Sequence, residues 1–92
     1  MSYPRILILY ADDWQGFFVE GELIVEGHTL GDGCGIISFL KHMSKEYNFT
    51  LLNVKEGYVD DLYMEYLEDY GNFHDELLYV TYNLKEKEDE YQ

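Results

Sequence analysis

The stretch RILILY, residues 5–10, decides the predicted fold, because it is a continuous apolar run placed directly after Pro4. Runs without polar alternation are typical of strands that are covered on both faces. We therefore predict a central strand here. The following Ala11-Asp12-Asp13 predicts a turn, since aspartate side chains form local hydrogen bonds there.

Two further strands are expected immediately after this turn. Residues 14–20 are rich in aromatic and β-branched residues, and Leu23-Ile24-Val25 is a second apolar run. Glu20-Gly21 links them, and a two-residue X-Gly connection between such runs is typical of a β-hairpin. The first 27 residues therefore predict a three-stranded antiparallel meander.

The rest of the chain predicts two helices that alternate with two strands. Thr29 and Asp32 resemble a capping box before a first helix that ends near Asn48 and buries Ile36, Phe39, Leu40, Met43 and Tyr47. A fourth strand is expected at residues 49–54, a turn at 55–57, a second helix at 57–70 and a last strand at 77–84. Residues 85–92 are polar and predict a frayed tail. The fold expected for residues 1–84 is one small α+β domain, β-β-β-α-β-α-β, with an antiparallel-rich sheet and both helices on one sheet face.

The second helix has an apolar, tyrosine-rich side and an acidic side. Its apolar positions recur every three or four residues, at Val59, Leu62, Tyr63, Tyr66, Leu67 and Tyr70. The acidic residues fall on the other side. Between Glu56 and Leu84 there are eight carboxylates and neither Lys nor Arg, within a chain whose net charge is −13. Charge this uneven destabilises a compact state through self-repulsion, so it calls for an explanation.

Composition narrows the class of protein and of partner. A chain of 92 residues that is 47% apolar is long enough for one small core. The strong negative charge argues against direct binding to nucleic acid or to an anionic membrane, and it suits a basic partner. A single cysteine, Cys34, excludes an internal disulfide and a cysteine-rich zinc site. Together with the lack of a signal-peptide pattern, this predicts a cytoplasmic protein.

Three local patterns resemble catalytic or metal-binding sites. Tyr10-Ala-Asp-Asp13 resembles the metal-binding turn of reverse-transcriptase palms, but the chain lacks the further parts of that site. The glycine-rich residues 31–35 lack the lysine of a phosphate-binding loop. Cys34 has no family signature around it that would mark a nucleophile, although three histidines, His28, His42 and His74, occur elsewhere. We therefore predict no enzymatic activity, no metal and no cofactor, and keep Asp12, Asp13, His28 and Cys34 as the group to test.

The acidic helix and its flanks form the predicted partner-binding surface. Neighbours three or four residues apart on a helix lie about 5–6 Å apart at Cβ, so Asp61, Glu65 and Glu68 form a stripe of charge that resembles phosphates along a DNA strand. We predict that this surface mimics nucleic acid and binds a basic, nucleic-acid-handling protein. The predicted residues are Glu56, Asp60, Asp61, Glu65, Glu68, Asp69, Asp75 and Glu76, with Tyr58 and Tyr63. Trp14, Phe17, Tyr58 and Tyr63 are candidate anchors and equally candidate core residues.

The segment Leu9–His28 also resembles the start of small proteins encoded by bacteriophages and their hosts. The shared pattern is L-Y-A-D-D-W-x-G-x-F-V-x-G-x-L-x-x-E-G-H. The resemblance implies the strand–turn–hairpin arrangement and a phage origin, with the bacterial cytoplasm as location. It transfers no functional residue. Small acidic phage proteins include inhibitors of host defence, such as anti-CRISPR proteins, and the resemblance implies an inhibitor of that kind.

Two alternatives stay open at this point. One is a homodimer or scaffold-type domain that pairs through a tyrosine-rich surface, since the chain has ten tyrosines. The other is that the acidic residues serve solubility alone.

Overall fold

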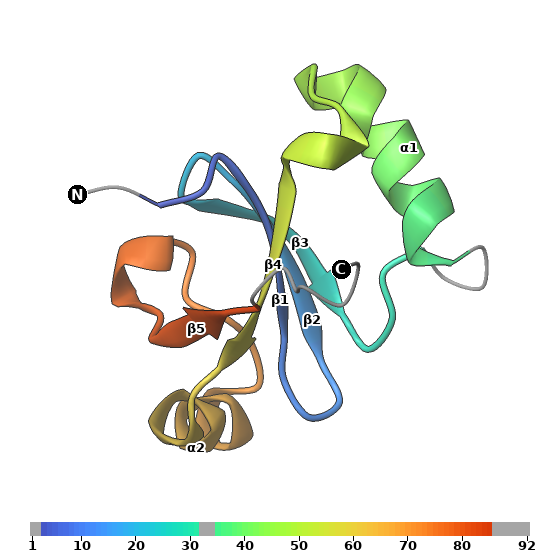
Figure 1. Cartoon of the computed structure of the whole chain (residues 1–92). Coiled ribbons are helices and arrows are strands. Elements are labelled where there is room, and N and C mark those ends of the chain that lie inside the picture. Colours follow the sequence, from blue (N-terminus) through green and yellow to red (C-terminus); the bar gives the residue numbers. More distant parts are fainter. Residues whose placement is uncertain (1–2, 32–34, 86–92) are drawn as a thin grey trace, which may run out of the picture.

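A computed structural model describes residues 3–31 and 35–85 (Figure 1). The strands are β1 (Ile6–Tyr10), β2 (Gln15–Val19), β3 (Glu22–Gly27), β4 (Val54–Val59) and β5 (Tyr82–Leu84). The helices are α1 (Ile36–Tyr47) and α2 (Asp61–Tyr70), and two short 3₁₀ turns cover Leu51–Asn53 and Leu77–Tyr79. This order confirms the predicted α+β domain. Of the predicted tail, residues 85–92, only Lys85 belongs to the described residues.

The five strands form one mixed sheet in the order β3-β2-β1-β4-β5. The β1–β2, β2–β3 and β4–β5 pairs are antiparallel, and the β1–β4 pair is parallel, with Ile6 opposite Val54 and Tyr10 opposite Tyr58. Residues 6–9 of β1 are all 0% exposed. The prediction of a central strand that is covered on both faces is therefore confirmed.

The core has two halves, one on each face of the sheet. Leu7 and Leu9 of β1 pack with side chains of α2, whereas Ile6 and Ile8 pack with side chains of α1. Successive residues of a strand point to opposite faces. The two helices therefore cover opposite faces, and they lie well apart in Figure 1. The expectation that both would share one face was wrong, because an apolar run such as β1 has to be covered on both sides.

The predicted hairpin between β2 and β3 is confirmed. Glu20 and Gly21 both have positive φ, at 50° and 84°. Two such residues in succession match a type I′ turn, whose twist suits a two-residue hairpin.

Helix α1 begins later than the glycine-rich segment suggested. Its N-cap is Gly35, which has no side-chain capping bond, so the Thr29–Asp32 capping box was wrong; Asp32 itself lies outside the described residues. The predicted buried side and the predicted end at Asn48, which adopts a left-handed conformation, are confirmed. Arg5 donates from Nη1 and Nη2 to the carbonyl oxygens of Asn48 and Tyr47, at 3.2 and 2.9 Å. The guanidinium thus satisfies the free carbonyl end of the helix, where a positive charge is favourable.

The fourth strand was predicted too early in the chain. Residues 51–53 form the first 3₁₀ turn, with Leu52 91% exposed, and the strand covers Val54–Val59 instead. The predicted turn at residues 55–57 is part of this strand. A Cβ on Gly57 would come within 2.9 Å of the carbonyl oxygen of Asn83, so the glycine marks a close approach of β5 rather than a turn.

The segment after α2 crosses the sheet before it forms β5. Leu23 of β3 donates its N–H to the Asp75 carbonyl, and Leu77 donates to the Gly21 carbonyl, both at 2.8 Å. The chain then returns to the other edge, where Asp60 donates its N–H to the Thr81 carbonyl at 3.1 Å. The predicted strand at 77–84 is therefore reduced to Tyr82–Leu84, because residues 77–79 have to turn the chain back.

Candidate functional site

The carboxylates of α2 share one exposed side of the helix. Asp61, Glu65, Glu68 and Asp69 are all exposed, and they lie opposite the side on which Tyr63 and Leu67 pack against the sheet. We call these four residues the acidic face. Within residues 3–31 and 35–85, none of the four carboxylates forms an ion pair or accepts a hydrogen bond. Among the described residues, the acidic face is therefore a surface of uncompensated charge.

The apolar side of α2 is narrower than predicted. Tyr63 is buried, and Met64, Tyr66 and Leu67 are partly buried against the same cluster. Leu62, however, is 74% exposed and lies at the margin of the acidic face. The helix also starts only at Asp61, so Val59 belongs to β4 and does not extend the helical period.

Asp60 has a structural role as the N-cap of α2. Its Oδ1 accepts hydrogen bonds from the N–H of Tyr63 at 2.9 Å and from the hydroxyl of Thr81 at 2.8 Å. These bonds stabilise the ionised form, and that from the Tyr63 backbone is the largest cause of a lowered pKa of Asp60. The carboxylate thus joins the start of the helix to Thr81, the residue before β5, and its Oδ1 is already engaged.

Glu56 lies away from the acidic face. It is opposite Ile8 in the β1–β4 register, and therefore on the sheet face that α1 covers in part. The hydroxyl of Tyr10 donates to its Oε2 at 3.2 Å, and Lys85 forms an ion pair with its Oε1 at 3.5 Å. Burial is the main cause that raises the pKa of Tyr10 to about 12, followed by the charge of Glu56.

The predicted aromatic anchors divide into surface and core residues. Tyr58 is 49% exposed and contacts the ring of Tyr10, with the ring centres 5.7 Å apart. Tyr63 is 5% exposed, and Phe17 is fully buried, so both are core residues. Burial raises the pKa of Tyr63, whose hydroxyl accepts a hydrogen bond from the N–H of His74 at 2.8 Å.

Asp75 and Glu76 are exposed but belong to another part of the surface. They lie in the segment that reaches the edge of β3, where Glu76 forms an isolated bridge with Glu22. Of the predicted acidic residues, the structure brings together the four of the acidic face. It places Asp75 and Glu76 at a sheet edge. The carboxylates of Asp60 and Glu56 form contacts within the fold instead.

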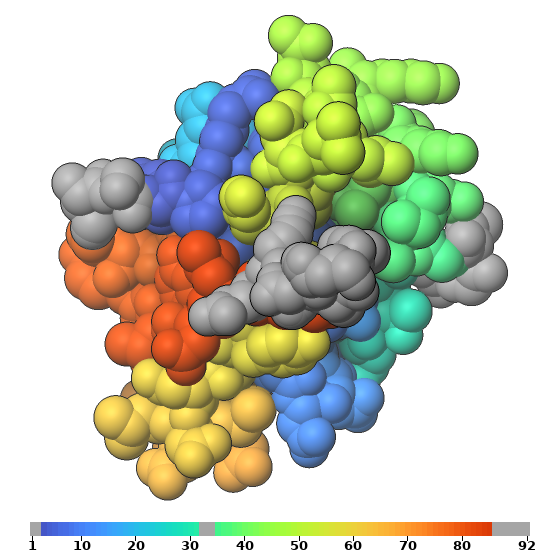
Figure 2. Space-filling model, viewed as in Figure 1, coloured from blue at the N-terminus to red at the C-terminus, as the bar shows by residue number. Residues whose placement is uncertain are grey.

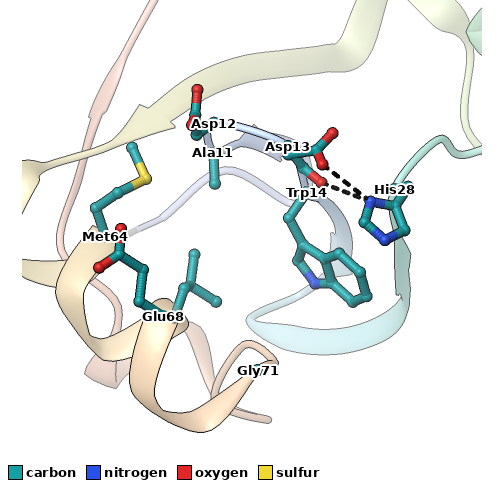
Figure 3. A pocket seen from close by; sticks show the side chains of 9 residues that line it. Ala11, Asp12, Asp13, Trp14, His28, Met64, Glu68 and Gly71 are labelled. Carbon is teal, nitrogen blue, oxygen red and sulfur yellow. Dashed lines mark hydrogen bonds and ion pairs between the residues drawn. The ribbon is translucent and has the colours of Figure 1, made fainter.

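A pocket lies between α2 and the turn that follows β1. Its volume is about 270 Å³, and it is lined by Ala11, Asp12, Asp13, Trp14, His28, Met64, Leu67, Glu68 and Gly71. Figure 3 shows Trp14 and Asp13 on one side of the pocket, and Met64 and Glu68 of α2 on the other. In the space-filling view, α2 and the turn lie side by side at the lower rim of the molecule (Figure 2).

The topology explains why a pocket forms at this place. Strands β1 and β4 are parallel neighbours, so the turn after β1 and the helix after β4 leave the sheet at the same end. A crevice outside the carboxyl ends of parallel strands is a frequent ligand site. The sequence showed the Asp12-Asp13 turn and the acidic helix separately. Only the parallel pairing of their strands, which has no clear sequence signal, brings them together.

The wall formed by Trp14 is fixed by hydrogen bonds. The indole Nε1 donates to Oε1 of Glu26 at 2.9 Å, and the same oxygen accepts the N–H of Phe73 at 2.7 Å. His28 packs edge-on against the indole, with the ring centres 4.8 Å apart. Glu26 and His28 therefore hold the aromatic wall in place before any ligand binds.

The group proposed for an enzymatic test is partly assembled at this pocket. His28 Nδ1 lies 3.0 Å from the carbonyl oxygen of Asp13, to which it can donate, and 3.4 Å from its carboxylate. Asp12 lines the same pocket, whereas Cys34 lies outside the described residues. In residues 3–31 and 35–85, no group of three or more His, Cys, Asp and Glu side chains is arranged to hold a metal ion.

Comparison with known proteins gives no relative from which a function could be transferred. The chain matches no protein-family model, no curated protein and no solved structure. None of the helices in the described part of the chain has the length and apolar character needed to cross a membrane.

Proposed function

We propose that this protein is an acidic binding protein that engages a basic, nucleic-acid-handling partner through the acidic face of α2. The observation that carries the proposal is the set of four exposed carboxylates, Asp61, Glu65, Glu68 and Asp69, none of which has a counter-charge in the described residues. A partner with clustered Lys and Arg side chains would supply the missing counter-charges.

The arrangement has an energetic cost in the free protein. Like charges three or four residues apart on a helix destabilise it by about 0.2–0.5 kcal/mol per pair, whereas opposite charges stabilise it by a similar amount. An ordinary solvent-exposed helix side mixes both signs. The acidic face contains only one sign, as expected of a surface whose favourable electrostatics arise on binding.

Nucleic-acid mimicry is the specific form of binding that we propose. Successive carboxylates on one side of a helix present a row of negative charge to a groove that normally holds a phosphate backbone. The resemblance of Leu9–His28 to phage-encoded proteins supports a further step, in which the partner is part of a bacterial defence system and binding inhibits it. That step is a proposal on the resemblance alone.

Capture of the partner from a bacterial lysate tests the proposal. The tagged protein should retain a basic protein at low salt, and high salt should release it, because exposed charge pairs are screened. The variant Asp61→Asn/Glu65→Gln should lose the partner. A matched control, Glu22→Gln/Glu46→Gln, removes the same charge from exposed positions on β3 and α1 and should retain it. Equal loss in both variants would show that only net charge matters and would overturn the proposal.

Self-association is a second candidate, because two large apolar side chains of α2 are exposed. Leu62 and Tyr70 of α2 are 74% and 67% exposed. If they pair two copies, the protein should elute as a dimer at high salt, and the dimer should survive the Asp61→Asn/Glu65→Gln substitution. A dimer lost on Leu62→Ser would identify the interface.

A further inference from the structure

We infer that the pocket between the Ala11–Trp14 turn and α2 receives one arginine side chain of the basic partner. The inference rests on the proposed function, since it names the partner group that enters this part of the surface. The size of the pocket is the first reason. Sites for drug-sized ligands span about 300–1,000 Å³, and this open pocket of about 270 Å³ is better matched to a single long side chain.

The lining matches the two chemical parts of an arginine side chain. Ala11, Met64 and Leu67 form an apolar wall that suits the methylene groups, as long charged side chains bury their stems against apolar surface. Trp14 supplies an aromatic wall for the guanidinium.

Two carboxylates at the pocket are available to neutralise the guanidinium. Asp13 already contacts His28, but Asp12 and Glu68 accept no hydrogen bond and form no ion pair within residues 3–31 and 35–85. They come from opposite sides, Asp12 from the turn and Glu68 from α2. Three carboxylates around one small pocket disfavour an anionic ligand, and His28 already directs Nδ1 at the Asp13 carbonyl.

Arginine fits these walls better than lysine does. Its planar guanidinium stacks on aromatic rings and presents several donors to carboxylates, whereas the lysine ammonium is a compact, strongly hydrated charge. The aromatic wall is held before binding by the bond from Trp14 to Glu26. Ordering of the pocket therefore costs little on association.

Glu68 links the pocket to the acidic face, because it belongs to both. A partner that lies along the acidic face can thus insert one side chain at the end of the row. The inserted arginine fixes the register of the partner, while the other carboxylates contribute screened, less directional attraction.

The single tryptophan gives a direct test, since all indole fluorescence comes from the pocket. The free protein is titrated with the blocked tripeptide Gly-Arg-Gly, with the Gly-Lys-Gly analogue, and with a citrulline analogue that keeps the shape of arginine but is neutral. We expect a saturable fluorescence change with Gly-Arg-Gly, a weaker one with Gly-Lys-Gly and none with the citrulline peptide. Glu68→Gln and Asp12→Asn should each weaken Gly-Arg-Gly binding about two- to fivefold, the range of one exposed charge pair. The matched control Glu65→Gln removes the same charge from the same helix, outside the pocket, and should change binding less.

Two results would overturn the inference. One is no saturable change with Gly-Arg-Gly, and the other is an equal loss in Glu65→Gln and Glu68→Gln, which would indicate diffuse attraction rather than a pocket. Either result leaves the proposed function standing if Asp61→Asn/Glu65→Gln still abolishes capture of the partner. Conversely, saturable arginine binding together with unchanged capture by that variant would retain the pocket and overturn the proposed function.

Discussion

At the residue scale, Gly16 shows how closely the elements approach one another. A Cβ placed on Gly16 of β2 would come within 2.7 Å of two ring carbons of Phe73, which covers this face of the sheet. The ring would have to move, and overpacking of this kind typically costs about 1–3 kcal/mol. We therefore expect Gly16→Ala to lower the free energy of unfolding by that amount in urea denaturation.

A second glycine of the sheet provides the control for this prediction. A Cβ on Gly27 would meet no atom within 4 Å, so Gly27→Ala should change stability by less than about 0.5 kcal/mol. If the clash with the ring is the cause, Phe73→Leu should recover part of the loss when combined with Gly16→Ala. Equal destabilisation by both alanine substitutions would show that the loss arises from the strand backbone and not from Phe73.

Tyr10 makes a prediction for alkaline pH. Burial is the largest cause that raises its pKa from 10.0 to about 12, and Glu56 adds both its charge and a hydrogen bond. Above pH 10 the unfolded chain loses this proton, while the folded chain keeps it until about pH 12. The folded state therefore loses stability as the pH rises through this window.

The ionisation of the tyrosines can be followed by phenolate absorbance. Tyr10→Phe should remove the component that titrates at the highest pH, and Glu56→Gln should shift that component to lower pH. A titration unchanged by Tyr10→Phe would contradict the assignment.

At the scale of elements, the start of α2 depends on Asp60. Its carboxylate caps the helix and also binds Thr81, and these bonds lower its pKa from 3.8. We expect Asp60→Ala to lower the thermal midpoint more than Asp60→Asn, which keeps an acceptor oxygen. Asp61→Asn, one residue on, is the matched control and should not lower it.

The pH dependence of this cap has a definite sign. A lowered pKa means that the unfolded chain binds the proton more tightly, so the cap contributes stability above pH 3.8, and this is lost as the pH falls through the pKa of the folded state. The difference in thermal midpoint between the wild type and Asp60→Asn should therefore shrink in acid. A difference that stays constant as the pH is lowered through the acid range would mean that the charge of Asp60 does not matter.

The elements that the sequence predicts best are those whose local chemistry and packing agree. The apolar run of β1, the Glu20-Gly21 hairpin and the end of α1 at Asn48 all follow from short-range rules, and the structure confirms them. Residues 49–59 were misassigned because Gly57 suggests a turn when only neighbours in the chain are considered. Its actual constraint is the approach of Asn83 in β5, which is 26 residues away in the sequence.

The candidate site was predictable only in its charge. The row Asp61, Glu65, Glu68 follows from helical spacing, and the structure places all three on an exposed side. The pocket requires the turn after β1 to meet the helix after β4, and hence depends on a parallel pairing of distant strands. Likewise, Asp60 and Glu56 have the same charge as the acidic face, and only their hydrogen bonds reveal a structural role.

At the scale of the whole molecule, the two helices on opposite faces of the sheet differ in charge. Helix α1 contains Lys41 and Lys45, whereas α2 contains four carboxylates and no Lys or Arg. Unequal charge on the two sides orients the protein as it approaches a basic surface. A basic partner of the kind that we propose would then meet α2 first, together with the pocket beside it.

The same charge makes a prediction for the isolated protein, because the acidic face repels itself when no partner is bound. Asp61–Glu65, Glu65–Glu68 and Glu65–Asp69 are like-charge pairs at helical spacing. At about 0.2–0.5 kcal/mol each, they destabilise the fold by about 1 kcal/mol, which corresponds to about 4–8 °C in the thermal midpoint of a domain this small. Raising the ionic strength screens these pairs, so we expect the midpoint, followed by circular dichroism, to rise by up to this amount between low and about 0.5 M NaCl.

Glu65 belongs to all three pairs, and Glu65→Gln should raise the midpoint at low salt and reduce its salt dependence. Glu22→Gln, on β3, should do neither to the same degree. A midpoint that falls with added salt would mean that favourable ion pairs outweigh repulsion in the free protein, and the acidic face would then need no partner to explain it. A rise with salt, together with weaker capture of the partner at the same salt, would show that one set of charges destabilises the free protein and stabilises the complex.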